Sequence, residues 1–173
     1  MMKLLRLRPG EKGFTIIEML ISLAVTAFIG LGVSVAITQI TTQTATNTNY
    51  TAASQEAMNA VHWIGQDIQM AQSVNGSTGF PETDDLTMSW TWWDNSEYTV
   101  TYSLQDGVLT RSYDNGTSSY NTVVARDVSS DPGLTYCTSD NYSYNISITI
   151  EIGTGQNAVQ VSRTRDIAAR PHL

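Results

Sequence analysis

Glu18 is the only ionisable side chain between Phe14 and Ile37, in a run that is otherwise apolar or bears hydroxyl groups. Placing an acidic side chain at the centre of a bilayer costs roughly 2.5 kcal/mol or more, so such a group is a functional candidate and needs a partner. We therefore expect Glu18 to form an ion pair.

The rest of the chain offers little for catalysis. Its histidines are His62, expected in the middle of a helix, and His172 at the C-terminus, so neither is placed as the base of a hydrolase triad. The sequence has no glycine-rich phosphate loop and no Cys/His metal spacing. Asp84-Asp85 and Asp94-Asn95-Ser96-Glu97 could supply oxygen ligands to calcium, but they are first of all solvated turn residues. We predict no enzyme, no catalytic residue, no metal and no cofactor.

A basic leader precedes the apolar run. Lys3, Arg6, Arg8 and Lys12 come before a Gly13-Phe14 junction, and the 24 residues from Phe14 to Ile37 follow it. As a helix with a rise of ~1.5 Å per residue they would span roughly 36 Å, enough to cross a hydrocarbon core of about 30 Å with some tilt. The excess of positive charge before the helix predicts a cytoplasmic leader, with everything after the helix outside.

Three other interpretations of this segment remain. A plain signal anchor explains the leader and the apolar run but not Glu18. A cleaved secretory signal has an apolar core of about 7–15 residues and a small-residue cleavage site beyond it, whereas this run is longer and carries an acid near its start. A buried core helix of a soluble protein does not explain the clustered leader cations.

The sequence Gly13-Phe14-Thr15-Ile16-Ile17-Glu18-Met19-Leu20 closely resembles the type III signal of bacterial type IV pilins and type II secretion pseudopilins. The resemblance covers about the first 30 residues of the chain. It implies that a prepilin peptidase cuts between Gly13 and Phe14 and methylates the new amino terminus on Phe14. It also implies that Glu18 is the family's acidic residue, five positions into the mature chain.

Physical chemistry gives that acid a role in assembly. Cleavage would leave an ammonium group on Phe14, about one helical turn from Glu18 in the same chain. In a filament, the carboxylate of an arriving subunit can instead meet the ammonium of the subunit ahead. In a low-dielectric environment this pair favours the correct axial register, and either charge alone is penalised. We predict that Glu18 is a docking charge.

The chain beyond the leader is acidic. After residue 13 it has fifteen acidic residues and five basic ones, all arginines, a formal charge of −10. An acidic exterior repels phosphate backbones, so we expect no nucleic-acid binding by this subunit alone. The single cysteine, Cys137, cannot form an intrachain disulfide. We expect a buried or inert thiol, and the alternative is a partner in another chain.

Apolar spacing predicts one long helix. No proline occurs between Ile37 and Pro81, and the chain keeps an apolar stripe at spacings of three and four residues. The stripe consists of Tyr50, Ala53, Ala57, Val61, Ile64, Ile68 and Ala71. We expect a helix from about Thr15 to Gln72, its first half in lipid and its second half on an outer domain. Trp63 lies off the stripe, and we expect it either to cover the domain edge or to contact a neighbouring subunit.

Beyond residue 85 the apolar period changes to two. Predicted strands cover residues 86–92, 98–104, 108–113, 122–128, 134–137, 142–152 and 158–164, with strong turns at Asp106-Gly107 and Asp114-Asn115-Gly116. One apolar face per strand predicts an antiparallel sheet packed on the helical stripe, an α+β fold. Trp90 and Trp92 fall on the predicted core face. Trp93 points the other way and is a candidate for an exposed contact with a partner.

Two further motifs resemble the J-type minor pseudopilins of type II secretion and the W-like minor pilins. The segment from Tyr102 to Arg111, Tyr-Ser-Leu-Gln-Asp-Gly-Val-Leu-Thr-Arg, matches their "Tyr-x-Leu … Asp-Gly-x-Leu-x-Arg" hairpin. The segment from Ile64 to Ala71 matches their "Ile-x-x-Asp-Ile-x-x-Ala" helix end. This looser resemblance covers perhaps half of the outer domain. It implies a minor subunit, and the paired C-terminal cysteines of many major pilins are absent.

These features predict a cleaved cytoplasmic leader at residues 1–13, a transmembrane helix half at 14–40 and an outer pilin-like domain at 41–173, with strands over 85–165. We expect a minor pilin or pseudopilin of the inner membrane that helps to initiate or cap a type IV pilus-like or type II secretion filament. Its partners would be other pilin subunits, the prepilin peptidase and the inner-membrane assembly platform. The alternative is a filament-borne subunit for binding, adhesion or DNA uptake that acts through Trp93 and neighbouring loops.

Overall fold

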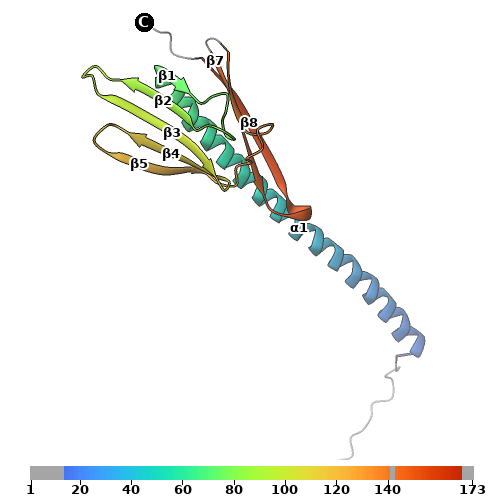
Figure 1. Ribbon diagram of the computed structural model, residues 1–173. Coiled ribbons are helices and arrows are strands. Elements are labelled where there is room, and N and C mark those ends of the chain that lie inside the picture. Colours follow the sequence, from blue (N-terminus) through green and yellow to red (C-terminus); the bar gives the residue numbers. More distant parts are fainter. Residues whose placement is uncertain (1–13, 141–142, 169–173) are drawn as a thin grey trace, which may run out of the picture. The chain divides into compact units, whose positions relative to one another are not determined.

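The computed structural model describes residues 14–140 and 143–168, so Gly13, Tyr142 and His172 lie outside the described residues. Contacts divide the described chain into two units with a boundary between Gln43 and Thr44. The helix α1 (Ile16–Met70) contributes to both units, and the second unit adds the β-strands (Figure 1). The predicted α+β fold, one long N-terminal helix packed on antiparallel sheet, is confirmed. Its division into two sheets was not predicted.

The larger sheet has the strand order β1-β2-β3-β4-β5, with all neighbours antiparallel. Its strands are β1 (Ser73–Asn75), β2 (Leu86–Thr91), β3 (Glu97–Gln105), β4 (Val108–Asp114) and β5 (Ser119–Ala125). The β3–β4 hairpin turns at Asp106 and Gly107, whose φ angles are 50° and 74°. Positive φ at both central residues is what a two-residue type I′ turn requires, so the turn predicted at Asp106-Gly107 is confirmed.

The smaller sheet has the order β6-β7-β8 and is also antiparallel. It consists of β6 (Tyr136–Asp140), β7 (Ser143–Ile152) and β8 (Val159–Ala168), and a short 3₁₀ helix, η1 (Gly155–Asn157), joins β7 to β8. Backbone contacts link the two sheets: the amide of Val128 donates to the carbonyl of Gly107 at 2.9 Å, and the amide of Glu151 donates to the carbonyl of Asp127 at 2.8 Å. The segment after β5 therefore ties the β3–β4 turn to β7.

The buried face of α1 follows the predicted stripe with one correction. Ala53, Ala57, Val61, Ile64, Ile68 and Ala71 are all buried, whereas Tyr50 is 52% exposed because the core begins one turn later. Small residues let the strands approach closely: a Cβ added to Gly65 would lie 3.0 Å from Nη1 of Arg165 and 3.3 Å from Cδ1 of Ile167 on β8. The helix thus contributes its apolar face to one core shared with both sheets.

Several strand predictions need correction. Trp90 is buried as predicted, but Trp92 is 52% exposed, because β2 ends at Thr91 and the alternation stops there. The strand predicted over 122–128 lies at Ser119–Ala125 and ends before Asp127, whose φ is 55°. The strand predicted from residue 134 starts at Tyr136, because the amides of Leu134 and Thr135 donate to the carbonyl of Asp131 in a turn.

Cys137 is buried on β6, which confirms the predicted buried thiol. Burial disfavours the thiolate and raises the pKa of Cys137 to about 12. Because the thiolate is the reactive form, this thiol is protected as long as the second unit is folded.

Candidate functional site

Phe14 and Glu18 lie at the start of α1, and both are exposed. The backbone N–H of Glu18 donates to Oγ1 of Thr15 at 3.3 Å and to the carbonyl of Thr15 at 3.1 Å. Thr15 is therefore the N-cap, and Thr15-Ile16-Ile17-Glu18 has the spacing of a capping box with Glu18 at the third helical position. A carboxylate in the first turn also interacts favourably with the helix dipole. Sequence reasoning missed this second role of Glu18.

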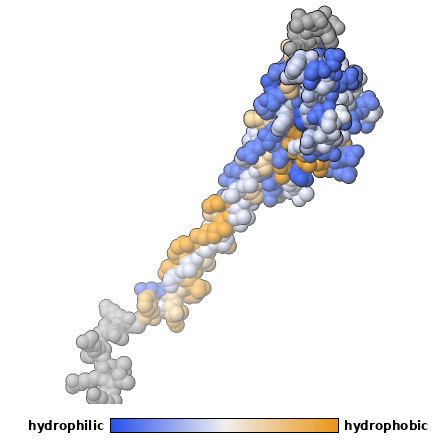
Figure 2. All heavy atoms as spheres, turned by 90° about the vertical axis from the view of Figure 1, so that its left-hand side faces the viewer, coloured by the Kyte–Doolittle hydropathy of each residue, from blue (hydrophilic) through white to orange (hydrophobic). Residues whose placement is uncertain are grey.

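The N-terminal unit exposes its apolar side chains. Every described side chain from Phe14 to Thr41 is exposed, and Figure 2 shows hydrophobic surface along this part of α1. The segment is long and apolar enough to cross a membrane, and none of its apolar window is buried. Soluble monomers rarely leave a large contiguous apolar surface in water. This exposure argues against a buried core helix and is consistent with a single-pass membrane anchor.

The hydroxyl groups in this segment are satisfied within the helix. Thr26 donates to the carbonyl of Ser22 at 2.7 Å, and Ser34 donates to the carbonyl of Gly30 at 2.9 Å. The same pattern, four residues back, recurs at Thr38, Thr41 and Thr42. A hydroxyl bonded to its own helix needs no water. These side chains are therefore compatible with lipid, and Glu18 is the one group in this segment whose charge requires a further partner.

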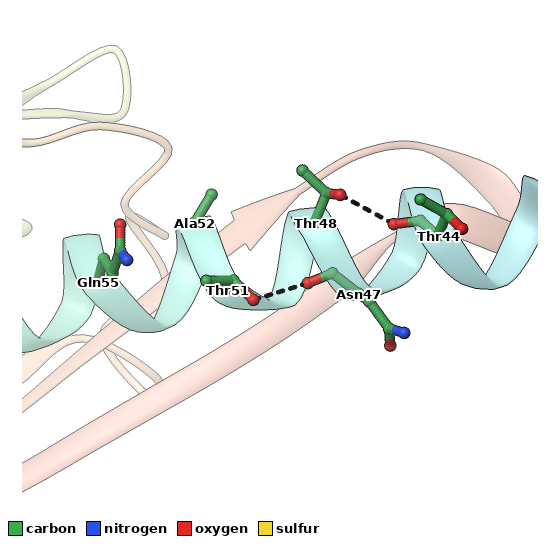
Figure 3. A pocket seen from close by; sticks show the side chains of 6 residues that line it. All are labelled: Thr44, Asn47, Thr48, Thr51, Ala52 and Gln55. Carbon is green, nitrogen blue, oxygen red and sulfur yellow. Dashed lines mark hydrogen bonds between the residues drawn. The ribbon is translucent and has the colours of Figure 1, made fainter.

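A shallow hollow of about 480 Å³ lies on α1 at the start of the second unit. It is lined by Thr44, Asn47, Thr48, Thr51, Ala52 and Gln55, all from this one helix (Figure 3). The hydroxyl of Thr48 donates to the carbonyl of Thr44, and that of Thr51 donates to the carbonyl of Asn47, each at 2.9 Å. Because these hydroxyls are directed to their own backbone, the hollow lacks the convergent polar groups of a ligand site.

The second unit contains a buried ion pair between α1 and the larger sheet. Arg111 on β4 holds Asp67 with two hydrogen bonds, Nε to Oδ2 at 2.7 Å and Nη2 to Oδ1 at 2.9 Å. The hydroxyl of Tyr102, which lies opposite Arg111 in the β3–β4 register, also donates to Oδ2. Asp67 is 1% exposed. Its carboxylate thus leaves water with both oxygens hydrogen-bonded, as a buried charge requires.

Aromatic rings cover the cation of this pair. The guanidinium carbon of Arg111 lies 5.2 Å from the ring centroid of Trp63 and 5.4 Å from that of Tyr113. Such cation–π contacts stabilise a partly desolvated guanidinium. Trp63 thereby covers the domain edge above Arg111, and it is still 42% exposed. Its predicted contact with another subunit stays a prediction.

The contacts within the cluster keep Arg111 and Tyr102 protonated. The hydrogen bond to Asp67 raises the pKa of the Arg111 guanidinium, and burial, together with the nearby Asp67 carboxylate, raises the pKa of Tyr102 far above its usual range. Arg111 therefore stays charged and Tyr102 stays a neutral donor. These groups satisfy one another's hydrogen bonds, so their chemistry is structural: they join α1 to the β3–β4 hairpin.

Both sequence motifs of the outer domain meet in this cluster. Asp67 belongs to the predicted helix-end motif, and Tyr102 and Arg111 belong to the hairpin motif, but sequence reasoning did not bring them together. The sequence did contain an indication of this contact. Asp67 lies between Ile64 and Ile68 on the buried face of α1, and an acid in that position must find a cation.

Trp93 lies apart from this cluster in the turn between β2 and β3, and it is 88% exposed. Asp94 in the same turn accepts hydrogen bonds from the backbone N–H and the hydroxyl of Ser96. Those bonds, the one from the hydroxyl above all, lower the pKa of Asp94. One oxygen of Asp94, Oδ1, thus accepts both bonds within the turn, in keeping with its expected role as a turn residue.

Residues 8–34 match the family model for the prokaryotic N-terminal methylation motif. No curated protein and no solved structure matches the chain. The matched segment contains the Gly13-Phe14 junction, the Thr15 cap and Glu18. The motif supports a pilin- or pseudopilin-type subunit of a filament, a structural protein that is processed by a prepilin peptidase and assembles with other pilin subunits.

The Asp67 cluster predicts a large loss of stability when one member is removed. Asp67→Ala should lower the free energy of unfolding by about 3–5 kcal/mol, because Arg111 and Tyr102 lose their buried partner. Denaturant unfolding of the full chain in detergent, followed by tryptophan fluorescence, measures this change. Glu82→Ala removes an exposed acid and should change stability by no more than about 0.5 kcal/mol. Equal effects of the two substitutions would contradict a stabilising role for the pair.

Proposed function

We propose that this chain is a minor pilin or pseudopilin that enters a type IV pilus-like or type II secretion filament and helps to initiate or cap it. The prepilin peptidase cuts between Gly13 and Phe14 and methylates the amino group of Phe14. Residues 1–13 are then the cytoplasmic leader, 14–40 the transmembrane half of the helix and 41–173 the outer domain. Before assembly the subunit lies in the inner membrane with its N-terminus in the cytoplasm and contacts the inner-membrane assembly platform.

The observation that carries this proposal is the start of α1 within the matched motif. The helix begins at Ile16, directly after the Thr15 cap, and leaves Phe14 exposed beside the first turn that contains Glu18. A cut before Phe14 would add an ammonium group at the end of a helix whose side chains are apolar and exposed. In lipid that ammonium and the carboxylate of Glu18 each need an opposite charge. Subunits stacked in a filament supply it to one another.

The assignment to a minor subunit is supported by the outer domain. The two motifs that resemble J-type pseudopilins and W-like pilins contribute Asp67, Tyr102 and Arg111 to one buried cluster. Residues that contact one another across the fold form a more specific pattern than either motif alone. The proposal extends to a tip complex with other minor subunits.

Glu18 has two candidate roles, and two substitutions separate them. Glu18→Gln keeps a residue suited to the capping box but removes the charge, whereas Glu18→Ala removes both. If Glu18 is a docking charge, both variants should enter filaments about 100-fold less than wild type, because the neighbouring ammonium loses its partner. The amount of chain in sheared, purified filaments measures this, after mass spectrometry has shown that each variant is cleaved.

The matched control is Thr15→Val, which removes the capping hydroxyl and keeps the carboxylate. It should enter filaments at nearly the wild-type level. Assembly of Glu18→Gln at the wild-type level, with loss only in Glu18→Ala, would assign Glu18 to helix capping and refute the docking role.

A second candidate function is binding of an external ligand or surface by the filament. The observation that favours it is the turn between β2 and β3, where Trp93 is 88% exposed and Trp92 is 52% exposed. Trp92 packs edge-on against Tyr98, with ring centroids 6.3 Å apart, so only Trp93 is free of such support. Exposed tryptophans are frequent binding hot spots.

Trp93→Ala should leave filament incorporation unchanged and reduce adhesion of filament-bearing cells. Unchanged adhesion would remove this candidate.

A further inference from the structure

We infer that Arg163 and Arg165 form a docking surface for carboxylates of the neighbouring filament subunit. The inference rests on the proposed function. The two side chains lie two residues apart on β8 and line a surface pocket of about 220 Å³. Its other lining residues are Met58, Val61 and His62 of α1 and Thr164 of β8. We call this surface the arginine pocket.

The fold holds both arginines against α1. Arg163 and Arg165 pair in register with Ile148 and Ile146 of β7, which are fully buried, so the arginines stand on the helix-facing side of their strand. Nη2 of Arg163 donates to the hydroxyl of Ser54 at 2.8 Å, and a Cβ on Gly65 would lie only 3.0 Å from Nη1 of Arg165. Arg163 is thereby hydrogen-bonded to α1 before any partner arrives, which lowers the entropy cost of binding, and Arg165 packs beside Gly65.

The positive charge of this pocket is not neutralised within the described chain. Among residues 14–140 and 143–168 the ion pair of Arg111 with Asp67 is the only one. Arg163 bonds a hydroxyl, and its buried Nε has no hydrogen-bond partner. Asp166 follows Arg165 in the sequence but accepts a hydrogen bond from Asn145 on β7 instead. Two adjacent guanidinium groups without a carboxylate favour an anionic partner.

The structure offers one competing explanation. β8 is an edge strand of the smaller sheet, and inward-pointing charges on edge strands prevent edge-to-edge aggregation. A positive or a negative side chain would serve that role equally well. A docking role requires positive charge, because the partner is acidic. Reversing the charge therefore separates the two explanations.

The expected occupant is an acidic segment of the adjacent subunit. The chain after residue 13 has fifteen acids and five arginines, so it has few cations to receive the carboxylates of a neighbour, and two of the five lie together in this pocket.

The test compares two charge reversals in the full chain, expressed in cells that assemble the filament. Arg165→Glu and Arg126→Glu each replace an exposed arginine and change the net charge equally. Arg165→Glu should lower the amount of chain in purified filaments about tenfold or more, because like charges then face each other across the contact. Arg126→Glu should stay within about twofold of wild type. Protection of the Cys137 thiol from reagents shows that each variant is folded.

A photo-crosslinking amino acid at Met58, which is exposed beside the arginine pocket, identifies the occupant. The expected product joins it to a peptide of another filament subunit that carries Asp or Glu. Equal incorporation of the two charge-reversal variants, or a crosslink to a peptide without acidic residues, would overturn the inference while the proposed function stands. Absence of the wild-type chain from filaments would instead refute the proposed function and the inference together.

Discussion

A carboxylate that leaves water needs a cation beside it, and of the acids Asp67 and Glu18 on α1 only Asp67 has a cation among the described residues. Asp67, in the second unit, is satisfied within the chain by Arg111 and Tyr102. Glu18, in the first unit, has no cation among the described residues, and its hydrogen bonds with Thr15 involve only its backbone. Asp67 therefore stabilises the fold, whereas Glu18, under the proposed function, pairs with another subunit.

The two parts of α1 are adapted to different surroundings, and their side chains show it. Between residues 14 and 41 the apolar groups face outward and the hydroxyls bond to their own helix, and Glu18 is the one charged side chain. Beyond residue 50 the buried face is built largely from alanine and isoleucine, so strands of both sheets pack closely on it. The ion pair with Arg111 and the hydrogen bond from Arg163 to Ser54 then fix one sheet each to the helix.

Local features of this fold could be predicted from the sequence, and long-range pairing could not. The uninterrupted helix and the Asp106-Gly107 turn depend on spacing and backbone preference, and both were predicted. Alternation indicates which face of a strand is buried but not which strand lies beside it, so the separation into two sheets was missed. Trp92 was misplaced for a related reason: the sequence pattern continues past the residue at which β2 ends. The contact between Asp67 and Arg111, which lie 44 positions apart, was not predicted because it too depends on long-range pairing.

The most direct test of the central claim is the mass of the N-terminal peptide of the chain recovered from cells that contain a prepilin peptidase. Because Glu18 is assigned to the freed amino group of another subunit, that group must exist. The recovered peptide should begin at Phe14 and carry one added methyl group. Recovery of the chain with residues 1–13 still attached and Phe14 unmodified would contradict it.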